Sequence, residues 1–339
     1  MPEKINVNTG DKVLICRTDR IGDLILTIPL IESMKLRYPD CPVDVLASDY
    51  AAPILENNPH VNEIIPLSNE RLRDDWEYFR DMISALKEKK YSAALAVFPD
   101  RRVARLIYKA GIPNRVGTAR RFHSIYFNRY LFHSRKKSNR HESEYNLDFL
   151  RFFQDGPTKH TPEIYITDAE KEKARQLLQA AGIKGPFAVI HPGSKGSAPA
   201  WPVRNFARLY KLLTDNEINV ILTGASDEIS VIDNMANESG QKINSLAGRT
   251  DLRSLAAVLS LAELIVANST GPLHMAAASG TQVVGFYPNE RVMSAKRWGP
   301  LGIGHKVFTP ESGNDMESIT VERVAQSIIP GMKRTEAAS

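Results

Sequence analysis

The feature that most constrains the fold of this chain is a strand, loop and helix pattern that begins near the N-terminus and starts again halfway along. In the first half, a short apolar run at Lys12–Cys16 precedes a polar loop and then Leu24–Tyr38, whose apolar residues recur at helical spacing. In the second half, Phe187–His191 precedes a Gly/Ser/Pro loop and a helical stretch at Val203–Leu213. Strands separated by helices pair in parallel, so the pattern predicts a doubly wound α/β sheet in each half.

Further buried segments extend both sheets. Apolar runs predict additional strands at Val43–Ala47, Glu63–Leu67, Ala93–Phe98, Asn219–Thr223, Ile243–Leu246, Glu263–Ala267 and Gln282–Tyr287. Helical spacing predicts helices at Asp74–Lys90, Arg101–Ala110 and Ile319–Ile329, with a frayed tail at Arg334–Ser339.

Glycine and proline residues divide the two halves. Gly156-Pro157 and Gly182–Pro186 interrupt the pattern and place a boundary within Asp155–Gly185. A chain of 339 residues has room for two domains of about 150 residues each. We therefore expect an N-terminal Rossmann-like domain at 1–165, a C-terminal Rossmann-like domain at 166–318, and a helix with a tail at 319–339.

Cysteine usage and hydropathy indicate a cytoplasmic protein. Cys16 and Cys41 are the two cysteines, and they lack CxxC or Cys/His spacing, which favours a reducing compartment and no zinc site. The segment Met1–Asp11 is polar and has no signal-peptide core. No run approaches the roughly 20 apolar residues of a membrane span.

Positive charge is concentrated in one segment, which we call the basic segment, from Arg101 to His141. The whole chain carries a net charge of +5, yet this segment holds twelve Lys or Arg residues and no Asp or Glu. Such asymmetry indicates a localised anionic partner. A solvated face is the alternative, although the aromatic residues of the segment argue against disorder.

A polar motif follows the first predicted strand, where open α/β sheets bind their ligands. It is Arg17–Pro29, with the sequence RTDRIGDLILTIP, in which Gly22 allows a tight turn and Asp23 falls at the start of a helix. Spacing alone leaves two interpretations of Asp23, an N-cap or a catalytic carboxylate that faces the ligand crevice.

Three small-residue segments in the second half predict a nucleotide-diphosphate site. Asn268–Ala278, NSTGPLHMAAA, places hydroxyls, backbone amides and a histidine at a helix N-terminus, which suits a diphosphate. His191–Trp201 adds a Gly/Ser loop whose amides would bind phosphate, and Thr223–Glu228 adds a loop that would contact the nucleotide base or ribose. The candidate ligand residues are Ser194, Lys195, Thr223, Gly224, Ser269, Thr270, Gly271, Pro272 and His274. Plain loops, helix caps and a histidine satisfied in the core remain the alternatives.

Several motifs of other nucleotide-dependent proteins are missing from the sequence. The chain has no GxGxxG, GxxxxGK[ST] or GxSxG pattern, so nicotinamide or flavin binding, a P-loop and an α/β-hydrolase lose their main support. No DxD-type carboxylate pair follows a strand, and we expect neither a metal nor another cofactor.

Together these segments resemble glycosyltransferase family 9, the lipopolysaccharide heptosyltransferases. The resemblance extends from Lys12 to Pro288. It rests on Arg17, Asp19, Gly22, Asp23, Thr27, Pro29, Pro39, Asn58-Pro59, Arg115–Gly117, His141–Leu150, the His-Pro-Gly-Ser loop ahead of Trp201-Pro202, and Asn268–Ala277. It implies a GT-B fold, with two Rossmann-like domains facing a central cleft.

The resemblance also implies a reaction, namely inverting transfer of a heptose from ADP-L-glycero-D-manno-heptose to the lipopolysaccharide inner core. The C-terminal domain would bind the donor, the N-terminal domain would bind the anionic lipid-linked acceptor, and Asp23 would be the base. Arg20, Arg120, Arg121, Lys136 and Lys137 are the candidate acceptor-binding residues. The acceptor also suggests peripheral contact with the cytoplasmic face of the inner membrane.

Two departures from the family pattern bear on the donor. Heptosyltransferases carry a lysine just before the Trp-Pro pair, where this chain has Pro199 and Ala200, so that Lys195 is a candidate replacement. Several carry aspartate where this chain has Ser269. The alternatives are a UDP-sugar transferase or epimerase of similar architecture, and a catalytically silent binding paralogue. No nucleic-acid motif supports binding of DNA or RNA by the basic segment.

Overall fold

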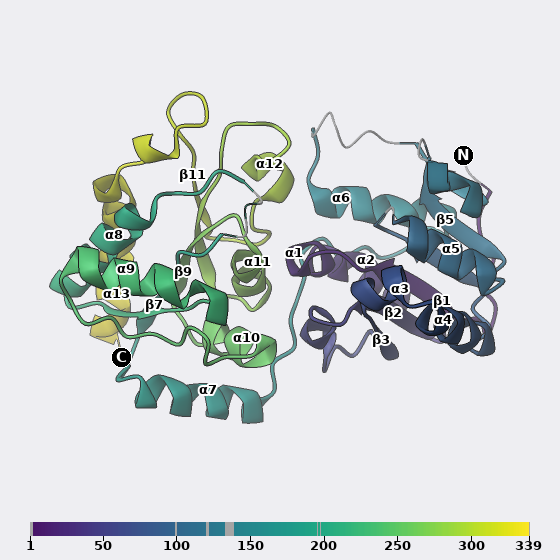
Figure 1. The fold of residues 1–339 in the computed structure, drawn as a ribbon, viewed down its shortest axis with the longest axis horizontal. Helices are drawn as coiled ribbons and strands as arrows, with labels where there is room; N and C mark the ends of the chain where they lie inside the picture. Colours follow the sequence, from purple (N-terminus) through teal and green to yellow (C-terminus); the bar gives the residue numbers. More distant parts are fainter. Residues whose placement is uncertain are drawn as a thin grey trace. The chain divides into compact units, whose positions relative to one another are not determined.

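The structure is a computed structural model. It describes residues 3–98, 100–119, 122–132, 139–194, 196 and 198–338, without the side chains of 123 and 334–338. The chain divides into two compact units (Figure 1). Unit 1 comprises residues 1–136 and 140–163, and unit 2 comprises 137–139 and 164–339. Each unit contains one parallel sheet, which confirms the prediction of two doubly wound α/β sheets.

The sheet of unit 1 has six parallel strands in the order β3-β2-β1-β4-β5-β6. They are β1 (Val13–Arg17), β2 (Val43–Ser48), β3 (Glu63–Leu67), β4 (Ala93–Ala96), β5 (Asn114–Thr118) and β6 (Arg129–Leu131). Cys16 of β1 pairs with Leu46 of β2 on one side and with Ala96 of β4 on the other. The order of the strands therefore reverses at β1, and the end of β1 is the switch point where such sheets bind ligands.

The helices of unit 1 begin at local capping signals. The Ser68 side chain caps α3, Asp75 caps α4, Asp100 caps α5 and His141 caps α6. The elements are α1 (Ile21–Ile25), α2 (Ile28–Arg37), η1 (Ala52–Leu55), α3 (Asn69–Asp74), α4 (Trp76–Glu88), α5 (Arg101–Lys109), η2 (Phe122–Tyr126), α6 (Glu142–Leu147) and η4 (Asp148–Phe152). Apolar residues of α4 and α5 pack on Leu14 and Cys16 of β1, which buries one face of the sheet.

The sheet of unit 2 has five parallel strands in the order β11-β10-β9-β7-β8. They are β7 (Phe187–His191), β8 (Asn219–Leu222), β9 (Leu264–Asn268), β10 (Gln282–Phe286) and β11 (Lys306–Phe308). The order reverses between β7 and β9, so this sheet also has a switch point at the carboxyl ends of its central strands.

An aromatic cluster holds the core of unit 2. The Trp201 ring stacks on Phe286, with ring centroids 4.3 Å apart, and the Trp201 indole donates a hydrogen bond to the Ile319 carbonyl over 2.9 Å. The helical elements are α7 (Asp168–Ala180), α8 (Val203–Asp215), η5 (Ser226–Glu228), α9 (Ile229–Ser239), α10 (Leu252–Ser260), α11 (Gly271–Ala278), α12 (Ala295–Trp298), η6 (Met316–Ser318) and α13 (Val321–Ala338).

Several predicted elements are wrong in their extent. Leu24–Tyr38 is not one helix, because α1 ends at Ile25 and Pro29 begins the next helix in its first turn. Asp74–Lys90 likewise belongs to two helices, since Asp75 ends α3 and caps α4. Ile243–Leu246 is not a strand and contributes one isolated bridge, between Ser245 and Leu222.

The C-terminal prediction is also wrong. Instead of ending at Ile329 and leaving a frayed tail, α13 continues to Ala338 and contains Pro330. The sequence reasoning missed β5 and the three-residue edge strands β6 and β11, and it missed α7, which lies within the expected boundary region.

Candidate active site

A buried arginine organises the loop that follows β1. Arg17 is the last residue of β1, and its side chain is 2% exposed. Its Nε and Nη2 atoms donate to the two carboxylate oxygens of Asp19 over 2.7 and 2.9 Å, and Nη2 also donates to Asp23 Oδ1. This fork binds two carboxylates with one planar group and fixes the orientation of both.

A third carboxylate reaches the same guanidinium from α6. Glu142 Oε1 lies 3.6 Å from Arg17 Nη1, and Glu142 is fully buried. Burial alone lowers the pKa of Arg17, but the negative charges of Asp19, Asp23 and Glu142 outweigh it and hold that pKa above its ordinary value. Arg17 therefore stays charged, and three acidic groups surround it.

Asn146 of α6 closes the network around Asp23. Its Oδ1 accepts from Arg17 Nη1 over 3.2 Å, and its Nδ2 donates to the Leu26 carbonyl over 3.0 Å and to Thr27 Oγ1 over 3.3 Å. The Thr27 hydroxyl in turn donates to the Asp23 carbonyl over 2.9 Å. The break between α1 and α2 is thus fastened to a helix that follows more than 100 residues later.

Asp23 occupies the third position of α1, so the N-cap interpretation is wrong. The N-cap residue is Arg20, whose side chain is exposed, and the helix has no side-chain capping hydrogen bond there. The Asp23 side chain is 14% exposed, although Arg17 binds one of its oxygens. A carboxylate that is held in place and partly exposed to solvent is suited to accept a proton.

In unit 2, α11 presents its N-terminus after β9, as predicted. Thr270 is the N-cap, and Pro272 lies in the first turn. The Thr270 hydroxyl donates to the Asn268 carbonyl over 3.1 Å, and His274 is buried one turn into the helix. Backbone amides in this first turn are oriented to bind an anion.

Ser269 and Asn268 shape the loops around this helix. Ser269 is hydrogen-bonded to the buried Tyr287 hydroxyl, so its side chain already has a partner within the protein. Asn268 Oδ1 accepts from the Trp201 amide over 2.8 Å, and its Nδ2 donates to the Pro192 carbonyl over 3.2 Å. Asn268 therefore fastens both ends of the loop between β7 and α8 to the end of β9.

At the end of β7, His191 contacts the predicted Thr223 and also Glu228; sequence reasoning selected neither His191 nor Glu228. His191 Nδ1 lies 3.1 Å from Thr223 Oγ1, and His191 Nε2 lies 3.8 Å from Glu228 Oε2. Thr223 is fully buried, so the predicted ligand residue contacts His191 inside the protein. Gly224 is buried beside it.

The Glu228 carboxylate lies against the neighbouring loop. Its Oε2 accepts from the Ala225 amide over 2.8 Å, and a Cβ at Gly193 would lie 2.0 Å from its Oε1. Only glycine leaves room for this approach. Ser194 is exposed next to Gly193, while the predicted Lys195 lies outside the described residues.

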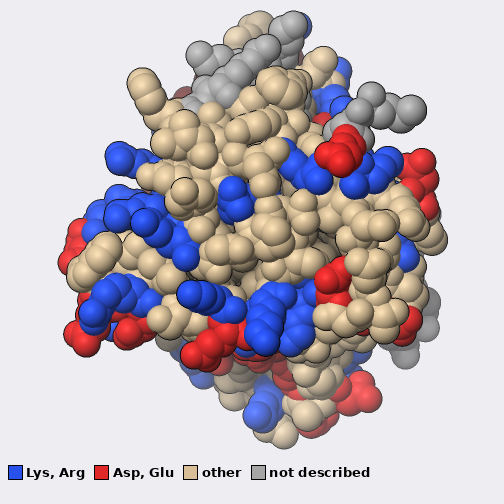
Figure 2. All heavy atoms as spheres, turned by 90° about the vertical axis from the view of Figure 1, so that its right-hand side faces the viewer, with Lys and Arg blue, Asp and Glu red and all other residues tan. Residues whose placement is uncertain are grey.

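The basic segment contains no acidic residue, but in the folded protein it forms ion pairs with acidic residues that lie outside it. Arg102 lies 3.8 Å from Asp100, Arg129 lies 3.4 Å from Glu3, and Arg140 lies 2.8 Å from Asp148. Figure 2 shows groups of Lys and Arg side chains on one face, with uncharged surface and some Asp and Glu side chains between them. The candidate acceptor residues Arg120, Arg121, Lys136 and Lys137 lie outside the described residues.

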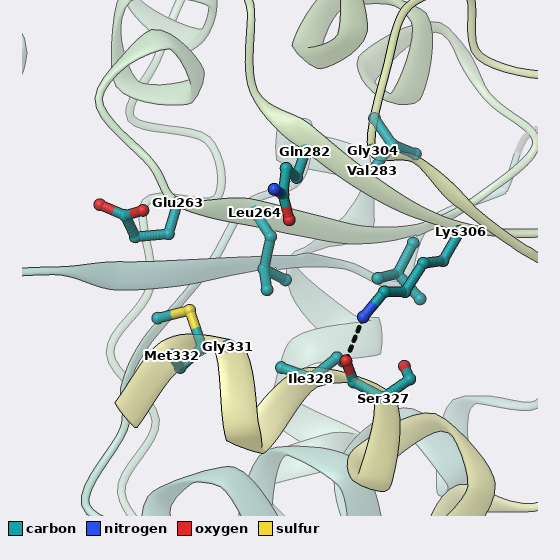
Figure 3. A pocket seen from close by; sticks show the side chains of 11 residues that line it. Glu263, Leu264, Gln282, Val283, Gly304, Lys306, Ser327, Ile328, Gly331 and Met332 are labelled. Atoms are coloured by element: carbon teal, nitrogen blue, oxygen red, sulfur yellow. Dashed lines mark hydrogen bonds between the residues drawn. The ribbon is translucent and has the colours of Figure 1, made fainter. Parts of the chain in front are cut away.

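A cavity of about 110 Å³ lies at the amino ends of the strands of the unit 2 sheet (Figure 3). It is lined by the first residues of β9, β10 and β11, among them Gln282 and Lys306, and by Ile328 of α13. The Lys306 ammonium donates to the Ser327 carbonyl beside it. The motifs all follow the carboxyl ends of strands, so this cavity is separate from the candidate site.

Neither a metal-binding cluster nor a membrane-spanning helix is found among the described residues. Across them, no group of three or more His, Cys, Asp or Glu side chains is arranged to hold a metal ion. Their helices include none that combines the length and the apolar character needed to cross a membrane.

A family model and individual sequence relatives identify the same family. Residues 79–322 match "Glycosyltransferase family 9 (heptosyltransferase)". The chain is 27% identical over 339 aligned residues to a Haemophilus influenzae protein whose name mentions glycosyltransferase activity and no substrate, with 94% of this chain and 96% of the relative covered. It is 28% identical to lipopolysaccharide heptosyltransferase 3 of Escherichia coli, with 78% and 79% covered.

Comparison with solved structures gives the same fold. A glycosyl transferase family 9 protein from Veillonella parvula superposes with a TM-score of 0.85 at 17% identity, covering 97% of this chain and 98% of that chain. The E. coli ADP-heptose lipopolysaccharide heptosyltransferase II superposes with a TM-score of 0.81 at 24% identity, covering 96% and 99%. The predicted GT-B type of fold is thereby confirmed.

Proposed function

Since this chain belongs to glycosyltransferase family 9, we propose that it transfers a heptose, with inversion, from ADP-L-glycero-D-manno-heptose to an acceptor in the lipopolysaccharide inner core. Its curated relatives include lipopolysaccharide heptosyltransferases 2 and 3. The observation that carries the proposal is the Asp23 carboxylate, which Arg17 holds at the switch point of the unit 1 sheet and which is partly exposed to solvent.

We assign the role of general base to Asp23. Its carboxylate takes the proton of the acceptor hydroxyl, while the hydroxyl oxygen attacks the anomeric carbon from the face opposite the diphosphate. The bond between the anomeric carbon and the phosphate oxygen breaks, and ADP leaves with the electron pair. Proton removal by a positioned base typically contributes about 10²–10⁴ in rate.

The donor is proposed to bind at unit 2. Backbone amides at the start of α11, around Thr270 and Gly271, would stabilise the charge that develops on the leaving diphosphate. His274, in the first turn of the same helix, would donate to a phosphate oxygen. Ser194 and Lys195, which follow Gly193 in the loop between β7 and α8, are proposed to bind the diphosphate as well.

The acceptor is proposed to bind at unit 1, so that residues 1–165 act as the acceptor domain and 166–318 as the donor domain. Inner-core Kdo carboxylates and phosphates are anionic, and the basic segment offers the opposite charge. Arg20 is exposed at the N-cap of α1, three residues before Asp23. We place the reaction at the cytoplasmic face of the inner membrane, where such an acceptor is anchored.

Incubation of the purified protein with ADP-heptose and a Kdo-containing lipid A acceptor tests this function. We expect the acceptor mass to increase by one heptose and one ADP to be released for each product. Asp23→Asn serves as the inactive control. Transfer from a UDP-sugar but not from ADP-heptose would contradict the proposed donor, and ADP release without a heavier acceptor would contradict transfer to this acceptor.

A further inference from the structure

Exposed apolar side chains are concentrated on one part of unit 1. Eleven large apolar residues are exposed in the described part of the chain, and five of them lie between positions 108 and 132. Phe122 is 99% exposed, and Ile125 and Phe132 are each 74% exposed. Scattered apolar residues are normal on a protein surface, whereas a concentration of this kind marks a site of contact.

Packing connects the elements that carry these residues. The η2 segment connects β5 to β6, and the Ala119 amide donates to the Leu131 carbonyl over 3.0 Å, just before Phe132. The ring centroids of Tyr108 and Tyr126 are 5.5 Å apart, so α5 packs against η2. Those of Tyr130 and Phe132 are 6.3 Å apart.

A buried ring and an arginine fix the loop that carries Phe122 and Ile125. Phe127 is buried, and its ring lies so close to Gly117 that a Cβ there would be 2.2 Å from it. Arg115 Nε donates to the Tyr126 carbonyl over 2.7 Å. With one aromatic ring and one arginine holding the end of η2, Phe122 and Ile125 are presented to solvent by an anchored loop.

Exposed cations lie on α5, the helix that packs against η2. Arg101, Arg105 and Lys109 recur at four-residue spacing and are exposed, whereas Leu106 and Ile107 on the other side of the helix are buried. The Arg105 guanidinium lies 5.6 Å from the ring centroid of Trp76, which is itself 61% exposed. No acidic residue interrupts this stretch of sequence.

From this juxtaposition we propose that η2, the end of β6 and the outer face of α5 form a surface that docks on an anionic lipid bilayer. Phe122, Ile125 and Phe132 enter the boundary between headgroups and acyl chains, and the α5 cations bind lipid phosphates. Protruding aromatic and aliphatic side chains bordered by Lys and Arg fit a membrane surface better than an apolar protein groove. The inference deepens the proposed function, since it supplies the contact that a lipid-linked acceptor requires.

Vesicle binding tests the surface without donor or acceptor. The purified chain is mixed with vesicles of 30 mol% phosphatidylglycerol in phosphatidylcholine, and bound protein is measured by co-sedimentation. We expect binding to these vesicles, and binding to pure phosphatidylcholine that is weaker by about tenfold or more. The variant with Phe122→Ser, Ile125→Ser and Phe132→Ser should lose about tenfold or more in partitioning.

Matched controls separate the surface from general effects. Ile229→Ser with Ile303→Ser removes two exposed residues of unit 2 and should leave binding unchanged. Arg101→Gln with Lys109→Gln should weaken binding, whereas Lys173→Gln with Lys242→Gln, which removes as much charge from unit 2, should weaken it less.

A gain-of-signal variant covers the case in which the triple variant misfolds. Trp76→Phe with Phe122→Trp places a tryptophan at the tip of η2, and we expect its emission to shift to the blue with anionic vesicles. No binding by the wild-type chain, equal binding by the triple variant, or no shift of the reporter would each overturn the proposal. Self-association that the triple variant abolishes would identify the surface as an interface between copies instead. Heptose transfer to a detergent-solubilised acceptor can succeed in every one of these cases, so the two proposals fail independently.

Discussion

In both units the candidate residues follow the carboxyl ends of parallel strands, but the two groups of residues differ in their chemistry. In unit 1, four ionisable side chains meet at the end of β1, with Arg17 bound to Asp19, Asp23 and Glu142. In unit 2, the start of α11 after β9 carries a glycine, backbone amides and neutral side chains such as Thr270, and the Glu228 carboxylate lies near His191 at the end of β7. A base that must keep its charge requires a fixed counter-ion, whereas a site for an anion requires uncompensated N–H groups.

This difference predicts how each unit responds to substitution. A buried group of mutually compensating charges contributes little net stability, but it is expensive to leave incomplete. A backbone site loses only the binding contribution of the side chain that is removed. Substitutions in unit 1 should therefore affect folding and chemistry, and those in unit 2 should affect ligand affinity.

The largest effect is expected from Arg17→Met. It leaves three carboxylates close together, with Glu142 fully buried, and should lower the free energy of unfolding by about 3–5 kcal/mol. Guanidinium chloride unfolding measures the loss. Arg71→Met is the control, because Arg71 forms an exposed ion pair with Asp75 and its removal should change stability by less than about 1 kcal/mol. Equal losses in both variants would mean that the cluster has no special role.

Asp23→Asn should have the next largest effect, and it should appear in turnover. The amide still accepts a hydrogen bond from Arg17 but cannot take a proton, so kcat should fall by about 100-fold or more while the melting temperature changes little. Asp19→Asn is a close control, since both aspartates bind Arg17 and both side chains are 14% exposed. If the two variants lose activity equally, the effect arises from the Arg17 cluster and Asp23 has no separate role as base.

The sequence predicts the apolar strands of each sheet better than the polar ones. Glu63–Leu67 and Phe187–His191 match β3 and β7 at both ends, because apolar residues dominate both runs. The strands β5 and β6 read NRVGT and RYL, which apolar periodicity does not detect. They form because backbone pairing continues outward from β4 to β5 and from β5 to β6.

The sequence likewise predicts some residues of the candidate site and misses others. Asp23 and the start of α11 follow strands directly, so their local sequence reveals them. Asn146 completes the unit 1 network across a separation of 129 residues, and no local pattern encodes that contact. The His191 and Glu228 contact also escaped, because it depends on the approach of two loops that Gly193 permits. The acidic stretch after His141 was the available signal for the α6 residues.

In unit 2, His274→Ala should weaken binding of ADP by about 1–3 kcal/mol and leave stability nearly unchanged. The reason is its position one turn into α11, behind the amides at Thr270 and Gly271. Isothermal titration calorimetry measures the affinity. His305→Ala provides a matched control, because His305 binds the Val283 amide at the opposite edge of the same sheet. Unchanged ADP affinity in His274→Ala would remove this histidine from the donor site.

The smallest effect concerns an ion pair of unit 2 that lies between helices α7 and α10. Arg253 donates to both Glu170 oxygens over 2.7 and 2.9 Å, and Glu170 also accepts from the Thr167 amide over 2.8 Å. Hydrogen bonding from Arg253 lowers the pKa of Glu170 from 4.5 to about 2. Unlike the Arg17 cluster, this pair is partly exposed, with Glu170 21% accessible, so solvent screening limits its contribution.

Glu170→Gln should therefore lower the free energy of unfolding by about 1–2 kcal/mol at neutral pH. A carboxylate with a lowered pKa in the folded state stabilises the protein fully above its ordinary pKa of 4.5, and this contribution disappears as the pH falls toward about 2. The difference between wild type and variant should thus be constant above about pH 5 and narrow in acid, as urea unfolding at several pH values would measure. Glu172→Gln, on the same helix and in an exposed ion pair with Arg175, should differ little from wild type at any pH. If the Glu170→Gln difference persists unchanged down to about pH 3, the charge of Glu170 is not what stabilises the contact between α7 and α10.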